Sequence, residues 1–122
     1  MAIAFLDTNI IIECLRGNKN ILNVVKGFDV LYVNDIVIME LYQGARNKKE
    51  LIFLKKHLSQ FKLLHTNQEI TTLAKIILEK YTLSHNTKIM DALIASTVII
   101  YNIELYTLNK KDFKYLEQVK LL

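Results

Sequence analysis

The sequence has few residues that interrupt regular structure or form covalent cross-links. It contains no proline, three glycines and one cysteine, so an intrachain disulfide is impossible. Cys14 lies in the largely apolar segment 10–15, where a buried thiol is expected rather than a reactive one. No linker, repeat or low-complexity segment is present, so residues 1–122 are expected to form a single domain.

Long hydrophobic runs are also missing. The longest apolar run covers residues 92–101, is interrupted by Ser96 and Thr97, and is too short to span a bilayer. It is typical of a buried core helix. Asp7 interrupts the apolar stretch near the start of the chain, so a secretory signal is not expected. These observations predict a cytoplasmic protein with no membrane partner.

Several motifs of catalysis are absent. The chain has no glycine-rich Gly-Lys-Ser/Thr sequence, which excludes a P-loop, and no Gly-x-Ser-x-Gly nucleophile elbow. His57, His65 and His85 lack the close spacing of zinc ligands. An aspartyl-phosphate enzyme would need a second aspartate two positions after Asp7, where Asn9 stands. These absences leave catalysis by several carboxylates as the chemistry that the sequence can still support.

Charge of one sign is only moderately enriched. The formal net charge is +4, carried mostly by lysine, with Arg16 and Arg46 as the only arginines. This balance favours a polyanionic partner such as RNA only weakly, because a charge of this size also serves solubility. Lys110 and Lys111 are the more informative lysines, because the turn that holds them adjoins the candidate site described below.

The remaining pattern alternates strands with helices. Strands are expected over residues 2–6, 29–33, 61–64 and 104–108, with a possible last strand over 118–121. Helices are expected up to about residue 16, over 36–45, 48–60 and 70–81, and from Asp91 onward. Their expected N-caps are Thr8 or Asn9, Asn34 or Asp35, and a capping box of Thr66 with Glu69. Such alternation predicts an α/β fold with a parallel sheet covered on both faces.

Acidic residues stand at strand ends and on the helices that follow. Asp7 follows the first strand, Glu40 lies in the helix after the second, Asp91 opens the most apolar helix, and Asp112 follows strand 104–108. Taken singly, each has an ordinary explanation as a helix cap, a dipole partner or an exposed side chain. Sites in parallel sheets form at the carboxyl ends of the strands, so together these acids are expected to converge.

A convergent acidic cluster requires protons or a cation. Two carboxylates about 4 Å apart repel by about 4 kcal/mol at an effective dielectric constant of about 20. Hard oxygen ligands favour Mg²⁺ or Mn²⁺, either as one ion or as two. Such an ion orients a phosphate, lowers the pKa of an attacking water and stabilises the leaving oxygen. The pattern therefore favours a phosphate-bearing substrate.

Four segments carry a resemblance to a known family. They are Leu6-Asp7-Thr8-Asn9, Met39-Glu40-Leu41-Tyr42-Gln43-Gly44-Ala45, Met90-Asp91-Ala92-Leu93-Ile94-Ala95, and Tyr106-Thr107-Leu108-Asn109-Lys110-Lys111-Asp112-Phe113. In this order and spacing the chain resembles the PIN-domain family, and specifically the VapC-type ribonuclease toxins of toxin–antitoxin pairs. The resemblance covers nearly the whole chain, although the proline often found before the third segment is missing.

The resemblance implies a fold, an activity and partners. It implies a PIN-like three-layer fold, Mg²⁺- or Mn²⁺-dependent endonucleolytic cleavage of RNA, a homodimer, and inhibition by a cognate antitoxin protein. By position, Asp7, Glu40 and Asp91 match the main acidic residues, and Asp7 and Asp91 are the expected metal ligands.

The fourth acidic position is divided between two residues. Asn109 stands where many PIN domains have an aspartate, while Asp112 offers a carboxylate one turn later. We expect Asp112 to contribute charge and Asn109 to act as a secondary ligand. Thr8 and Thr107 match positions whose hydroxyls support the acids. The alternative is a non-catalytic RNA- or protein-binding module on the same fold, for which metal would be irrelevant.

Overall fold

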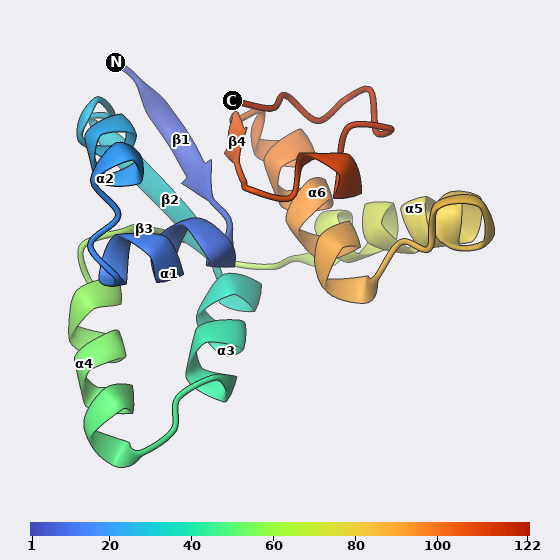
Figure 1. The fold of residues 1–122 in the computed structure, drawn as a ribbon. Helices are drawn as coiled ribbons and strands as arrows, with labels where there is room; N and C mark the ends of the chain where they lie inside the picture. The colour runs from blue at the N-terminus through green and yellow to red at the C-terminus, as the bar shows by residue number, and fades with distance from the viewer.

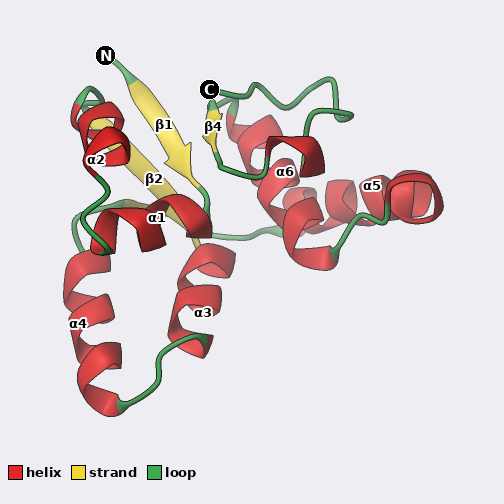
Figure 2. Ribbon diagram, viewed as in Figure 1, coloured by secondary structure: helices red, strands yellow, loops and turns green.

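The computed structural model describes residues 1–122 as an α/β fold with one four-stranded sheet. Figure 1 traces the chain and Figure 2 separates its helices from its strands. The elements are β1 (Ile3–Leu6), α1 (Thr8–Leu15), α2 (Lys19–Lys26), β2 (Val30–Asn34), α3 (Asp35–Gln43), α4 (Lys48–Leu58), β3 (Lys62–Leu64), α5 (Gln68–His85), α6 (Ile89–Tyr101), β4 (Leu105–Tyr106) and the 3₁₀ helix η1 (Lys110–Asp112). The parallel sheet is flanked by helices, which confirms the predicted α/β class.

All strand pairs are parallel, in the order β3-β2-β1-β4. The inner strand β1 pairs on one side with β2 and on the other with β4, so that Phe5 lies between Tyr32 and Leu105. Ala4, Phe5 and Leu6 have no exposed surface, as expected for a strand covered on both faces. Because the strands run in one direction, their carboxyl ends meet at the same edge of the sheet.

Helix α6 forms the centre of the core. Its residues Ala92, Ile94, Ala95 and Val98 are buried against the rest of the apolar cluster. Its two buried hydroxyl groups are satisfied within the helix, since those of Ser96 and Thr97 donate to backbone carbonyls at 2.7 Å. The predicted core helix is thus confirmed. No helix has the length and apolar content needed to cross a bilayer.

A buried polar contact joins α3 to α6. The Asn34 amide donates to Thr97 Oγ1 at 3.1 Å, and its oxygen accepts from the Val37 backbone N–H at 3.0 Å. Asn34 and Thr97 have no exposed surface. A buried amide satisfied in both its roles fixes relative position more sharply than apolar contact does. The helices that carry Glu40 and Asp91 are therefore held in one arrangement.

The helix N-termini agree only in part with the expected caps. Asn34 caps α3, as predicted, but Asp7 itself occupies the N-cap of α1 in place of Thr8 or Asn9. The predicted capping box of Thr66 with Glu69 is wrong. Asn67 caps α5 by accepting from the Ile70 N–H at 2.9 Å. Asparagine is the stronger N-cap residue, and its use starts the helix one position later.

Two further elements differ from the expected ones. Helix α2 was not predicted, although Ile21, Val24 and Val25 recur at helical spacing. Asn18 caps it and Ile21 anchors it in the core. The possible last strand is reduced to one parallel bridge between Leu105 and Leu121. The chain after β4 is consequently held by a few side chains rather than by a sheet ladder.

The cap assignment at α5 can be tested with two neighbouring substitutions. Asn67→Ala should lower the free energy of unfolding by about 1 kcal/mol, because it removes the capping acceptor. Thr66→Val should leave it unchanged or raise it, because the Thr66 hydroxyl is buried without a hydrogen-bond partner. Urea unfolding followed by circular dichroism measures both. The reverse order of effects would restore Thr66 as the cap.

Candidate active site

The carboxyl end of β1 delivers Asp7 to the edge of the sheet, at the start of α1 (Figure 1). The side chain is only 6% exposed. Its Oδ1 accepts from the Thr8 backbone N–H at 2.8 Å, and its Oδ2 accepts from the Thr107 hydroxyl at 2.8 Å. Burial raises the pKa of Asp7, whereas the hydrogen bonds from Thr107, Thr8 and Asn9 oppose the rise.

Asn9 joins the ends of β1 and β4. Its amide nitrogen lies 3.3 Å from Asp7 Oδ2 and 3.4 Å from Thr107 Oγ1, and its oxygen accepts from the Leu108 N–H at 3.1 Å. Sequence reasoning gave Asn9 only the role of a possible helix N-cap, which the structure assigns to Asp7 instead. Its position two residues after Asp7 was visible, but its contact with Leu108 depends on the pairing of β1 with β4.

Glu40 reaches the same region from the second turn of α3. Because α3 begins directly after β2, its side chains lie at the carboxyl edge of the sheet. Glu40 Oε1 accepts from the Thr8 hydroxyl at 2.8 Å. The two threonines named from the sequence thus contact acids: Thr8 contacts Glu40 and Thr107 contacts Asp7.

Asp91 lies in the first turn of α6 and is half buried. Burial raises its pKa from 3.8 to about 6, followed in size by the negative charges of Asp112, Asp7 and Glu40, while Lys88 opposes the rise. Asp91 therefore lies within electrostatic reach of the other three acids named from the sequence. Their convergence at one sheet edge is what the strand-end argument predicts.

The residues of the fourth position differ in their surroundings. Asp112 ends η1, is half buried, and raises the pKa of both Asp7 and Asp91 through its charge. Asn109 is exposed; its backbone N–H donates to Thr107 Oγ1 at 3.0 Å, and its side chain caps no helix. The structure thus couples Asp112 to the other acids, while ligation by Asn109 stays a prediction.

The donor set fits a hard divalent cation held in part by water. No three acidic, histidine or cysteine side chains are arranged as joint ligands of one ion. Mg²⁺ commonly takes one or two protein carboxylates and retains several waters, so two ligands suffice. Asp7 and Asp91 are the pair whose pKa values are raised, and a cation would relieve the cost of ionising both.

A groove of about 600 Å³ opens beside Glu40, between α1, α3 and α4. Its floor is apolar, and its walls hold both arginines of the chain. Arg16 pairs with Glu13 and Arg46 pairs with Glu50, each at 3.1 Å. Both guanidinium groups are largely exposed, but each is paired with a glutamate, so the groove presents mixed charge next to the acidic cluster.

The arrangement of these acids can be compared with known proteins. The model of the PIN domain family matches residues 4–118. The chain belongs to the PIN-domain family. A curated relative, Ribonuclease VapC of Rickettsia bellii, is 36% identical over 95% of this chain and 92% of its own length. Ribonuclease VapC1 of Rickettsia felis is 34% identical over 96% of this chain and 92% of its own length.

Solved structures share the PIN fold. A toxin–antitoxin complex from Klebsiella pneumoniae contains a chain with a TM-score of 0.81 and 26% identity, covering 95% of this chain and 94% of its own length. The resemblance to VapC-type PIN proteins stated from the four sequence segments is therefore confirmed.

The raised pKa of Asp91 predicts a pH dependence of stability for the metal-free PIN domain. The folded state holds a proton on Asp91 up to about pH 6, whereas the unfolded chain releases it near its ordinary value of 3.8. As the pH rises from about 4 to about 6, ionisation of Asp91 therefore lowers the free energy of unfolding, which stays lower at higher pH. Because the side chain is half exposed, solvent screening reduces the effect to about 1 kcal/mol at neutral pH.

Asp91→Asn removes this titration. From about pH 4 to about pH 7, the unfolding free energy of the variant should rise relative to that of the wild type. Urea unfolding at a series of pH values, without metal, measures the difference. Glu79→Gln, which changes an exposed acid on α5, serves as the control and should show no such trend. A difference between Asp91→Asn and wild type that does not vary with pH would contradict the raised pKa.

Proposed function

We propose that this PIN domain is a metal-dependent endoribonuclease and the toxin of a type II toxin–antitoxin pair. One observation carries the chemical part of the proposal: Asp91 lies near three other carboxylates, so that, after burial, the charges of Asp112, Asp7 and Glu40 raise its pKa. Four carboxylates held in mutual repulsion at a sheet edge favour binding of a cation over a purely structural role. The names of the curated relatives support cleavage of RNA as the reaction.

In this proposal, Asp7 and Asp91 hold the ion, and Glu40 and Asp112 add negative charge around it. Bound Mg²⁺ or Mn²⁺ supplies Lewis acidity toward a phosphodiester and lowers the pKa of a bound water. Thr107 and Asn9 keep Asp7 Oδ2 oriented, and Thr8 does the same for Glu40 Oε1.

The basic residues near the cluster support a polyanionic substrate. Lys88 adjoins Asp91, and Lys110 and Lys111 precede Asp112; all three are exposed. Lysines placed around a metal centre neutralise the phosphates that flank a scissile bond, at an affinity that falls with salt. These contacts are to the backbone, so they do not determine which RNA is bound.

The partners follow from the same assignment. The Klebsiella pneumoniae structure is described as a toxin–antitoxin complex, and we infer that this chain also binds an antitoxin protein. The homodimer expected from the family resemblance and the cytoplasmic location expected from the sequence remain parts of this proposal. Exposed apolar residues such as Met39, Ile76 and Leu83 offer surface for protein contacts.

The competing function is a non-catalytic binding module on the same fold. A binder of RNA gains nothing from acids that repel phosphate, and neutralising them should strengthen its binding. Two of the acids, Asp7 and Glu40, are instead held in place by hydrogen bonds from Thr8, Asn9 and Thr107. This arrangement favours the enzyme.

Cleavage by the purified protein tests the proposal. With Mg²⁺ or Mn²⁺ the wild type should cut RNA, and Asp7→Asn and Asp91→Asn should each lose about 100-fold or more in rate. Both substitutions keep the shape of the side chain, and asparagine also caps a helix well, so the variants should remain folded. Glu79→Gln, on the exposed face of α5, should cleave like the wild type.

Thermal melting gives a second readout of the same site. Millimolar Mn²⁺ should raise the melting temperature of the wild type, because an ion that binds only the folded state stabilises it. The rise should shrink in both asparagine variants. If the folded wild type left RNA intact with every divalent metal and gained no stability from Mn²⁺, the enzymatic assignment would be overturned.

A further inference from the structure

Asp112 lies in a segment with little regular structure to hold it. After β4 the chain contains only the three-residue η1 and one bridge at Leu121. Phe113, directly after Asp112, is fully buried, and Leu116 and Val119 further along the segment are also buried. These apolar anchors restrain the backbone but do not offset the repulsion between Asp112 and Asp91, which favours separation of the two carboxylates.

Tyr115 provides a polar attachment for this segment. Its hydroxyl forms a hydrogen bond with Thr87 Oγ1. Thr87 is buried in the short connection between α5 and α6, four residues before Asp91. One hydrogen bond thus ties the segment that carries Asp112 to the turn that carries Asp91.

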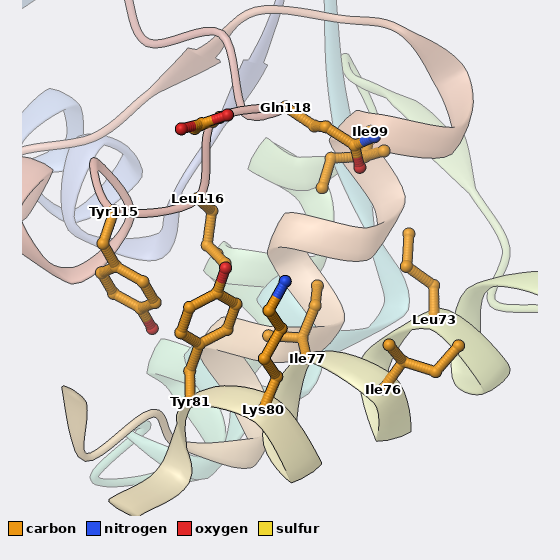
Figure 3. A pocket seen from close by; sticks show the side chains of 10 residues that line it. Leu73, Ile76, Ile77, Lys80, Tyr81, Ile99, Tyr115, Leu116 and Gln118 are labelled. Carbon is orange, nitrogen blue, oxygen red and sulfur yellow. The ribbon is translucent and has the colours of Figure 1, made fainter. Parts of the chain in front are cut away.

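Aromatic contacts fix the direction of the Tyr115 ring. It stacks on His85 with ring centroids 4.1 Å apart and planes inclined by 15°, and it meets the edge of Tyr81 at 5.1 Å. Figure 3 shows Tyr115 and Tyr81 side by side at one end of a pocket of about 320 Å³ between α5, α6 and the C-terminal segment. The ring can therefore stay in place even without its hydroxyl.

We propose that Tyr115 is a positioning residue, which acts through its hydrogen bond with Thr87 to hold Asp112 at the acidic cluster. The role at a metal site rests on the proposed function, whereas the hydrogen bond and the ring contacts are features of the chain itself. The pair stabilises the position of a charge that repulsion would otherwise displace. Because Asp112 is already in place when a metal ion binds, binding costs less free energy than it would if the segment had first to become ordered.

The substitutions that isolate this bond are conservative. Tyr115→Phe removes the hydroxyl and keeps the stacked ring, and Thr87→Val removes the partner hydroxyl at similar volume. Thr87→Ser keeps the hydroxyl and should preserve the wild-type behaviour. Tyr101→Phe, at the exposed end of α6, is the matched control for loss of a tyrosine hydroxyl.

The first measurement is amide hydrogen exchange of the metal-free protein. The Asp112 N–H donates to the Asn109 carbonyl, and the N–H groups of Phe113 and Lys114 donate to the Lys110 carbonyl. Tyr115→Phe and Thr87→Val should speed their exchange by about three- to tenfold, as expected for loss of one hydrogen bond that restrains them. Unchanged exchange at these amides would overturn the proposal, whether or not the protein binds metal or cleaves RNA.

The second measurement is calorimetric titration with Mn²⁺ alone. Tyr115→Phe should raise the Mn²⁺ dissociation constant by about three- to tenfold, but should cause no further rise in a chain that already carries Asp112→Asn. Equal effects in both backgrounds would show that Tyr115 does not act through Asp112. An unchanged dissociation constant in Tyr115→Phe would likewise overturn the positioning role.

The outcomes separate this inference from the proposed function. If the wild type binds Mn²⁺ but cleaves no RNA, the ribonuclease assignment fails and the titration still tests the role of Tyr115. If the wild type binds no Mn²⁺, the metal site fails, and hydrogen exchange alone decides whether the bond to Thr87 restrains Asp112. If RNA is cleaved, Tyr115→Phe should lower kcat and leave KM for RNA unchanged.

Discussion

Repulsion between carboxylates at the carboxyl edge of the sheet is the constraint on which the rest of this structure depends. Asp7, Glu40, Asp91 and Asp112 come from four different segments, and each segment is secured by contacts away from the charges. Ala4, Phe5 and Leu6, directly before Asp7, are fully buried, and so is Phe113, directly after Asp112. Like charges repel, so the acids do not hold one another in place. The buried apolar residues next to them keep their segments together instead.

Hydrogen bonds refine what burial alone would leave loose. Thr107 and Asn9 link the end of β1 to the end of β4, and the buried pair of Asn34 and Thr97 links α3 to α6. In each case a polar side chain joins two elements that carry or precede an acid. A polar network of this kind is stabilising only when every buried group is satisfied. It therefore defines one arrangement of the acids rather than a range of them.

The sequence predicted the parts of this arrangement that depend on local pattern. Short-range signals predict the strand that ends before Asp7, the strand that begins near residue 104, and the core helix near Asp91. They also give the order of the acids along the chain. The contributions of Asn9 and Tyr115 could not be predicted, because they arise when β4 pairs with β1 and when the C-terminal segment packs on α5. The cap at Asn67 was missed for another reason: Thr66 and Asn67 are both good caps, and only packing decides between them.

Asp7 has two roles that make different demands on its side chain. As the N-cap of α1 it needs only an oxygen that accepts a hydrogen bond, whereas as a member of the acidic cluster it needs a negative charge. Asparagine meets the first demand and not the second. A single nucleotide change from an aspartate codon to an asparagine codon would therefore yield a chain that keeps its shape and its binding surfaces but lacks the charge.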